Sequence, residues 1–217
     1  MSYLNARQMK ERIIEKHLLI DPYCEIFQGP NLYYCHLGNS FIFPKRLDVP
    51  FDPMNPQENE KNFVKKYITE PIVIESNQFF LAETFEFFAT DDITIIRLFN
   101  SSSLARAGIS HCAIGMINPG CGKYNPVRLT LELVNHAPYP IILHPTCIEK
   151  ETRQVIHWGT EVLKIGVQVI AEKVSQSYSD WSEAIYHEDQ EVSSSKMHQR
   201  FLKANNFIIP TESVVLK

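Results

Sequence analysis

A carboxylate stands in the middle of a segment whose alternate residues are apolar. The apolar residues are Val127, Leu129, Leu131 and Leu133, and the polar residues between them are Arg128, Thr130 and Glu132. Successive side chains of a strand point to opposite faces, so the pattern predicts a strand with one face in the core and Glu132 on the other. A carboxylate partly removed from water can take up and return protons near neutral pH. Glu132 is therefore a candidate acid and base, and a solvated or ion-paired strand residue is the alternative that alternation leaves open.

A cluster of hydroxyls with an arginine precedes that segment. Ser101, Ser102 and Ser103 are followed by Arg106. Hydroxyls both donate and accept hydrogen bonds, and a guanidinium offers a planar, permanently charged fork that suits phosphate oxygens. The segment is either a phosphate-binding turn or a hydroxyl-capped turn with a surface arginine, and the residue types alone favour neither.

A short turn lies between these two segments. Its residues run Asn118-Pro119-Gly120-Cys121. Proline fixes the backbone of the second position of a turn, and glycine tolerates the positive φ that a type II bend requires at the third. The composition predicts such a bend and by itself assigns it no chemistry.

The elements that must position these groups are mainly strands. Period-two patterns rich in β-branched and aromatic residues predict strands over residues 67–75, 79–88, 93–99, 127–135, 141–144 and 162–174. Helical spacing of Met9, Ile13 and Ile14 predicts one helix over residues 5–16, with Asn5 as its N-cap. Residues 48–66 are polar and rich in proline, which indicates a surface excursion. Many short strands with little helix predict an all-β sandwich or barrel.

The bulk composition excludes several classes of partner and compartment. The chain has 217 residues and a formal net charge of -4, so we expect one domain and neither nucleic-acid nor membrane binding, which usually require a basic surface. The five cysteines form no C-x-x-C pair, which argues against a disulfide framework or a zinc knuckle. No signal-peptide h-region and no apolar run of membrane-spanning length occur. We expect a cytoplasmic protein.

Four blocks in order resemble the dCTP deaminase branch of the dUTPase-like superfamily. The blocks are SSLARAG, SHCAIGMINPG, LTLELVN and PIILHP, and members of the branch show SSLAR, THVTAGxIDPG and LELxN in succession. The close match covers residues 102–143. The resemblance implies a single domain over residues 1–217, folded as a distorted jelly-roll β barrel with a short N-terminal helix. It also implies a homotrimer whose active sites are shared between subunits, an insertion near residues 146–158 and a C-terminal lid near residues 176–217.

The resemblance also implies roles for individual residues. Glu132 would activate the water that attacks C4 of cytosine and would then shuttle protons. The nucleotide and its phosphates would be bound by Ser102, Ser103, Arg106, Asn118 and Tyr186, and the base pocket would be formed by Cys112, Ala113 and Ile114. The triphosphate would arrive with Mg²⁺, which prefers oxygen ligands. No zinc is implied, and the H-x-E plus P-C-x-x-C signature of zinc-dependent deaminases is absent.

Several positions depart from the family pattern. Asn118 replaces the aspartate of the IDPG turn, whose dUTPase counterpart helps to activate water, and an amide cannot take up a proton. In the lid, Ile185 removes an attractive charge and Asp189 adds a repulsive one near phosphates. His111 matches a family histidine, for which a hydrogen-bonded structural role is expected.

The resemblance, with Glu132 retained, favours a hydrolase that deaminates dCTP, or a close analogue, to dUTP and ammonia. The altered lid leaves open a non-catalytic or regulatory deoxynucleotide-binding trimer. A dUTP diphosphatase is the second alternative, and Asn118 argues against it.

Overall fold

The protein is mostly β-structure, with few and short helices. The computed structural model describes residues 2–55, 57, 61–149, 151–152, 154–186 and 189–199. The helices that lie wholly within these ranges are α1 (Ala6–Ile14), α3 (Ser102–Ala107) and the 3₁₀ turns η1 (Glu25–Phe27) and η2 (Tyr178–Asp180). No helix in the described ranges is long and apolar enough to cross a membrane.

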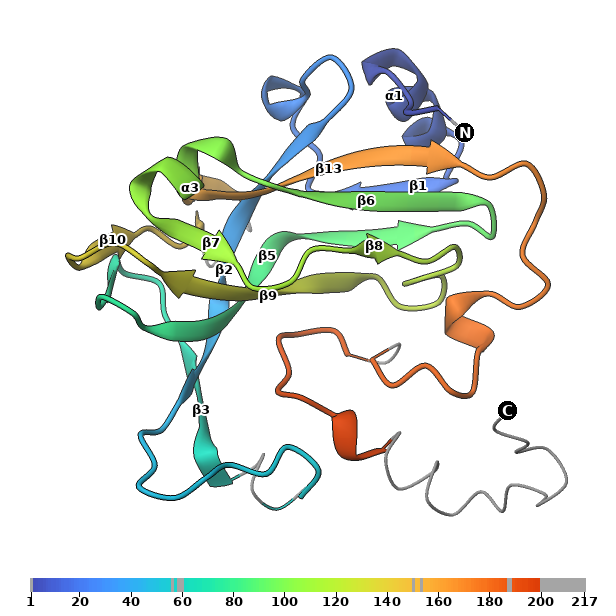
Figure 1. Cartoon of the computed structure of the whole chain (residues 1–217). Coiled ribbons are helices and arrows are strands. Elements are labelled where there is room, and N and C mark those ends of the chain that lie inside the picture. The colour runs from blue at the N-terminus through green and yellow to red at the C-terminus, as the bar shows by residue number, and fades with distance from the viewer. Residues whose placement is uncertain are drawn as a thin grey trace, which may run out of the picture.

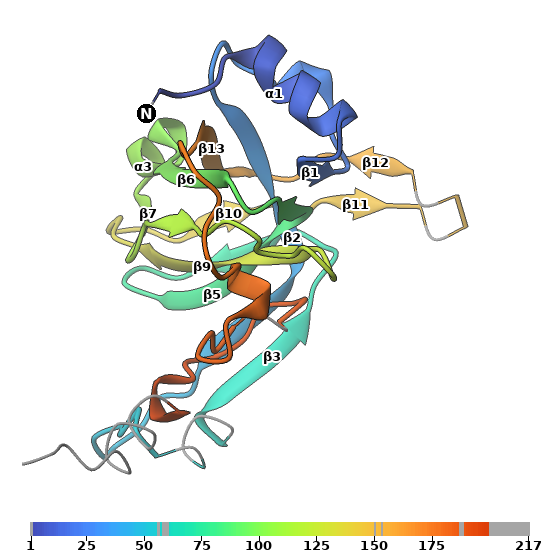
Figure 2. The same ribbon diagram turned by 90° about the vertical axis from the view of Figure 1, so that its right-hand side faces the viewer.

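Nine strands of the described chain form one curled antiparallel sheet (Figure 1). The order is β7 (Ile109–His111), β9 (Val127–Asn135), β5 (Phe79–Thr90), β2 (Tyr33–Pro44), β13 (Glu161–Val169), β6 (Thr94–Asn100) and β8 (Met116–Ile117). In addition, β1 (Leu18–Asp21) pairs with β5, and β3 (Phe63–Tyr67) pairs with β2. Two further antiparallel pairs join β10 (Ile141–Leu143) to β4 (Ile72–Ile74), and β11 (Cys147–Ile148) to β12 (Val155–His157). Figures 1 and 2 place α1 at one end of the sheet and β3 at the other.

Two expectations from the sequence hold in detail. The strand predicted over residues 127–135 is β9, and its burial alternates residue by residue, with the aliphatic positions inside. The helix predicted near the N-terminus is α1, where the Asn5 side chain accepts the Gln8 backbone N–H and the Gln8 side chain accepts that of Asn5. This reciprocal capping explains why the helix begins at Ala6.

Other boundaries differ from the sequence expectation. The strand expected over residues 67–75 is divided between β3 and β4, with Pro71 between them, because proline cannot donate to a ladder. The excursion expected near residues 48–66 is shorter, since Phe63–Tyr67 forms β3. The last expected strand, 162–174, ends at Val169. Residues 146–158, for which an insertion is expected, contain β11 and β12.

Polar side chains are buried at the positions where the pairing register between the long strands shifts. The pairing of β5 with β9 shifts between Glu83 and Phe87, and that of β2 with β5 shifts between Leu37 and Phe41. Such irregularities bend strands and leave backbone groups without ladder partners. Fully buried Thr84 accepts the Leu129 N–H at 2.9 Å, and fully buried Glu86 accepts the backbone N–H of His36. Buried side chains of β5 therefore replace missing backbone hydrogen bonds.

Replacing Thr84 by valine is expected to destabilise the fold by about 1–3 kcal/mol, because it leaves the buried Leu129 N–H without an acceptor. The hydroxyl also donates to the Glu86 carbonyl at 2.9 Å. Urea unfolding of Thr84→Val measures the change. The matched substitution Thr152→Val, at an exposed position, should shift stability by less than about 0.5 kcal/mol; equal effects of the two substitutions would contradict the role given to Thr84.

Candidate active site

A cavity of about 450 Å³ lies between the polar face of β9 and the chain that follows β13. We call the described residues of that chain, 170–186 and 189–199, the C-terminal segment. Three successive polar residues of β9 line it, namely Arg128, Thr130 and Glu132. Asn118 and Tyr186 line it as well, together with serines of the C-terminal segment. The cavity is large enough for a small-molecule ligand, and it brings together three residues for which the sequence predicts nucleotide contacts or catalysis.

Glu132 is half-buried in this cavity and forms no ion pair with any described residue. Burial raises the pKa of its carboxyl above the ordinary value, because the charged form loses hydration. Its backbone carbonyl accepts the N–H of Cys112 at 2.7 Å, which fixes the strand locally. Within the described ranges, no charged partner neutralises Glu132 as the ion-paired alternative would require.

Activity that uses Glu132 as a base should fall at acidic pH with an apparent pKa above 4.5, the ordinary value of a glutamic acid. The sign follows because only the ionised carboxylate accepts a proton, and burial disfavours ionisation. A pH profile of kcat/KM measures this limb. An acid limb at or below pH 4.5 would contradict the assignment.

The turn that carries Asn118 has the predicted type II form. The Cys121 N–H donates to the Asn118 carbonyl at 3.2 Å, and Gly120 has a φ of 77°. A Cβ atom at Gly120 would lie 2.3 Å from the Cβ of Ser177. Glycine is therefore required here both by the backbone and by the close approach of the C-terminal segment.

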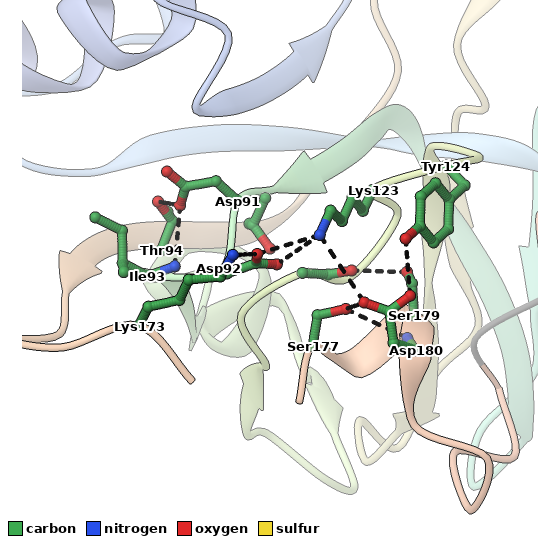
Figure 3. A network of polar contacts seen from close by, with 12 residues as sticks. Asp91, Asp92, Ile93, Thr94, Lys123, Tyr124, Lys173, Ser177, Ser179 and Asp180 are labelled. Atoms are coloured by element: carbon green, nitrogen blue, oxygen red, sulfur yellow. Dashed lines mark hydrogen bonds and ion pairs between the residues drawn. The ribbon is translucent and has the colours of Figure 1, made fainter. Parts of the chain in front are cut away.

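An ionic network fixes the C-terminal segment beside this turn (Figure 3). The Asp92 carboxylate contacts Lys173 at 2.8 Å and Lys123 at 3.1 Å, and these cations hold the pKa of Asp92 below its ordinary value. On the other side of the network, the Tyr124 hydroxyl donates to Asp180 at 2.8 Å. The segment that leaves β13 is thereby held against the loop that lines the cavity.

Three of the predicted phosphate-binding residues do not line the cavity. Ser102, Ser103 and Arg106 are exposed on α3, and none of these described residues lines the cavity. In Figure 1, α3 lies at the upper left and the C-terminal segment at the lower right. The expectation that Glu132 shares a pocket with these groups is therefore not met within one chain. Ser101 caps α3 through the Leu104 N–H, as the hydroxyl-capped alternative expected.

The predicted base-pocket residues are exposed next to Glu132 but outside the cavity. They are Cys112, Ala113 and Ile114. The nearby Glu132 charge and partial burial both raise the pKa of the Cys112 thiol, with burial the larger cause. His111 has the expected hydrogen bond, from its Nε2 to the Val162 carbonyl at 2.9 Å, and burial lowers its pKa. This hydrogen bond to a backbone carbonyl fits the structural role expected for His111.

Sequence reasoning gave no role to three serines of the C-terminal segment or to a buried acid. Ser193, Ser194 and Ser195 line the cavity together with Asp189. Glu83, on β5, is fully buried and pairs with Arg128 at 2.7 Å. The expected lid extends to residue 217, and its residues 187–188 and 200–217 lie outside the described ranges. Among the described residues, no three His, Cys, Asp or Glu side chains are grouped to hold a metal ion.

The curled sheet places the chain in a known class of mostly β folds. A crystal structure of 2'-deoxycytidine 5'-triphosphate deaminase from Agrobacterium tumefaciens is similar, with a TM-score of 0.54 and 15% sequence identity. The likeness covers 77% of this chain and 48% of the other. At this identity the likeness concerns the fold.

The sequence comparisons define the family. The family model described as dCTP deaminase-like matches residues 3–147. A relative from Methanopyrus kandleri, named dCTP deaminase, dUMP-forming, is 32% identical over 212 residues, which are 94% of this chain and all of the relative. A relative of the same name from Nanoarchaeum equitans is 33% identical over 158 residues, covering 65% of this chain and 78% of its own. The chain belongs to the dCTP deaminase-like family.

Proposed function

We propose that this protein deaminates dCTP to dUTP and ammonia, with Glu132 as the proton shuttle. The observation that carries the proposal is a half-buried carboxylate that lines a ligand-sized cavity and pairs with no described cation. A carboxyl with a raised pKa suits a group that both accepts and donates protons during one turnover. The membership of the dCTP deaminase-like family supports the same reaction.

The proposed reaction consumes one water for each cytosine. Glu132 removes a proton from water as the oxygen bonds to C4, which gives a tetrahedral carbon bearing both oxygen and the amino group. The carboxyl then returns that proton to the ring, a second proton passes from the new hydroxyl to the amino nitrogen, and the C4–N bond breaks. The products are the uracil nucleotide and ammonia, and Glu132 ends as it began.

The phosphates are proposed to be held across a boundary between copies of the chain. Ser102, Ser103 and Arg106 are exposed and do not line the cavity of their own chain, and in the proposed homotrimer they lie near the Glu132 of a neighbour. Cys112, Ala113 and Ile114 would then contact the base beside Glu132. We propose that Mg²⁺ arrives with the triphosphate as part of the substrate, since it binds phosphate oxygens.

The product is proposed to be dUTP because of Asn118. This residue lines the cavity where an acidic side chain would be needed to activate a second water against the phosphates, and an amide accepts no proton. The relatives from Methanopyrus kandleri and Nanoarchaeum equitans are named as dUMP-forming, so dUMP is the alternative product that the experiment must detect.

One assay separates the possibilities. Incubation of the full chain with magnesium dCTP is followed for ammonia, uracil nucleotides and pyrophosphate, beside a parallel reaction with dUTP. Ammonia with dUTP and no pyrophosphate is the expected result. Ammonia with dUMP and pyrophosphate would overturn the argument from Asn118 while leaving deamination intact. Pyrophosphate from dUTP without ammonia from dCTP would indicate a diphosphatase, and binding with neither product a regulatory trimer.

A further inference from the structure

We propose that Glu83 is a positioning residue, which together with Arg128 fixes residues 189–196 in the wall of the cavity that contains Glu132. These two residues form a buried link between β5, β9 and the C-terminal segment, and we call this link the latch. The consequence for catalysis rests on the proposed function, whereas the structural link does not.

The carboxylate of Glu83 is fully buried and serves two donors. Its Oε1 accepts from Nη1 of Arg128 at 2.7 Å, and its Oε2 accepts the backbone N–H of Val192 at 3.0 Å. A buried carboxylate without partners would be very costly, and two charge-assisted hydrogen bonds offset that cost. Only an acceptor-only group with two oxygens satisfies both donors at once.

Arg128 is held in place from two sides. Its guanidinium lies over the Phe87 ring, 4.3 Å from the ring centroid, and pairs with Glu83. The same residue lines the cavity, four positions before Glu132 on the same face of β9. The latch therefore connects the C-terminal segment to the strand that carries the proposed base.

The latch acts on a segment that is already braced internally. The Val192 side chain is buried against Ile42 and Leu81. Asp189 accepts from the Ser193 hydroxyl at 2.5 Å and pairs with Lys196. Fixing the backbone of Val192 therefore fixes the side chains of Asp189 and Ser193, both of which line the cavity.

The decisive variant removes both charges together. Glu83→Met with Arg128→Met leaves no unpaired buried charge, and replacing a buried ion pair by apolar residues of similar volume is often tolerated. The Val192 N–H nevertheless loses its acceptor. The single variant Glu83→Gln keeps Arg128 but replaces one acceptor oxygen by a donor, so it weakens the latch without removing the cation from the cavity.

The matched control is Glu191→Gln. Glu191 precedes Val192 and pairs with Lys65 at 2.5 Å, but both side chains are about half exposed, and an exposed pair contributes little. The Glu191→Gln variant tests whether removing any carboxylate near residues 189–196 alters their hydrogen exchange and the KM for dCTP as the Glu83 variants do.

Hydrogen exchange of the ligand-free full chain is the first readout. In the double variant, amides of residues 189–196 should exchange at least about tenfold faster than in the wild type, because the acceptor of Val192 is gone. Amides of β5 and β9, and the Glu191→Gln chain, should stay near wild type. The second readout is steady-state deamination of dCTP by Glu83→Gln, where KM should rise about fivefold with kcat changed by less than about twofold.

Each outcome decides the proposal. Unchanged exchange at residues 189–196 in the double variant would overturn it. Faster exchange spread equally over β5 and β9 would also overturn it, because Glu83 would then support the sheet rather than the segment. If the wild type releases no ammonia from dCTP while the exchange result is as expected, the proposed function fails and the latch stands.

Discussion

Replacing Glu132 by glutamine is expected to lower kcat for dCTP deamination by at least about 10³-fold, near the upper range for loss of a general acid–base group. The amide has nearly the same shape as the carboxyl but cannot accept the proton of the attacking water. Because Glu132 forms no ion pair with any described residue, its neutralisation strands no buried cation, and the fold should be retained. Ammonia release under saturating dCTP measures the change.

The controls for this substitution follow from the same environment. Since burial raises the pKa of Glu132, its ionisation costs folding free energy at neutral pH, and Glu132→Gln should unfold at the same or a slightly higher urea concentration than the wild type. Nucleotide binding should persist, because a nearly isosteric change at the reacting carbon removes an interaction of the transition state. A variant that keeps more than about a tenth of the wild-type kcat would remove Glu132 from its proposed role.

The sequence predicts the central strand of the site well, because local pattern and tertiary environment agree there. In β9 the period of two coincides with the observed alternation of burial, and the Asn5 cap and the Asn118 turn depend only on neighbouring residues. Such features are determined by backbone geometry over a few positions, so they can be recognised without knowledge of the fold.

The features that the sequence missed depend on contacts between distant segments. β2 is buried along nearly its whole length, so it shows no alternation that would mark a strand. The importance of Glu83 arises from Arg128 and Val192, which are 45 and 109 positions away. A buried acid in an otherwise apolar strand is a usable signal in retrospect, but its partners are visible only in three dimensions.

The proposal of a site shared between copies of the chain rests on the separation of α3 from the cavity. The cavity contains the proposed base and the turn of Asn118, whereas its only lining cation among the described residues, Arg128, is already paired with Glu83. A triphosphate would need further positive charge. Arg106 is exposed and forms no ion pair with the described residues, so a second copy of the chain is the natural source of that charge.

Replacing Arg106 by alanine is therefore expected to lower kcat/KM for dCTP by about 10²-fold or more, since a phosphate would lose a charge-assisted, bidentate partner.

The activity lost in Arg106→Ala should return when this variant forms mixed oligomers with the Glu132→Gln variant, which keeps Arg106. When Arg106→Ala and Glu132→Gln chains are unfolded together and refolded as mixed trimers, a site between two copies is intact wherever one contributes Glu132 and its neighbour Arg106. In an equal mixture, about half of the chains carry an intact Glu132 and the other half an intact Arg106. A shared site therefore receives both residues in about a quarter of cases, and about a quarter of the wild-type activity should return. Mixed oligomers that are detected by native mass spectrometry but remain as inactive as either variant would place Arg106 and Glu132 in separate functions.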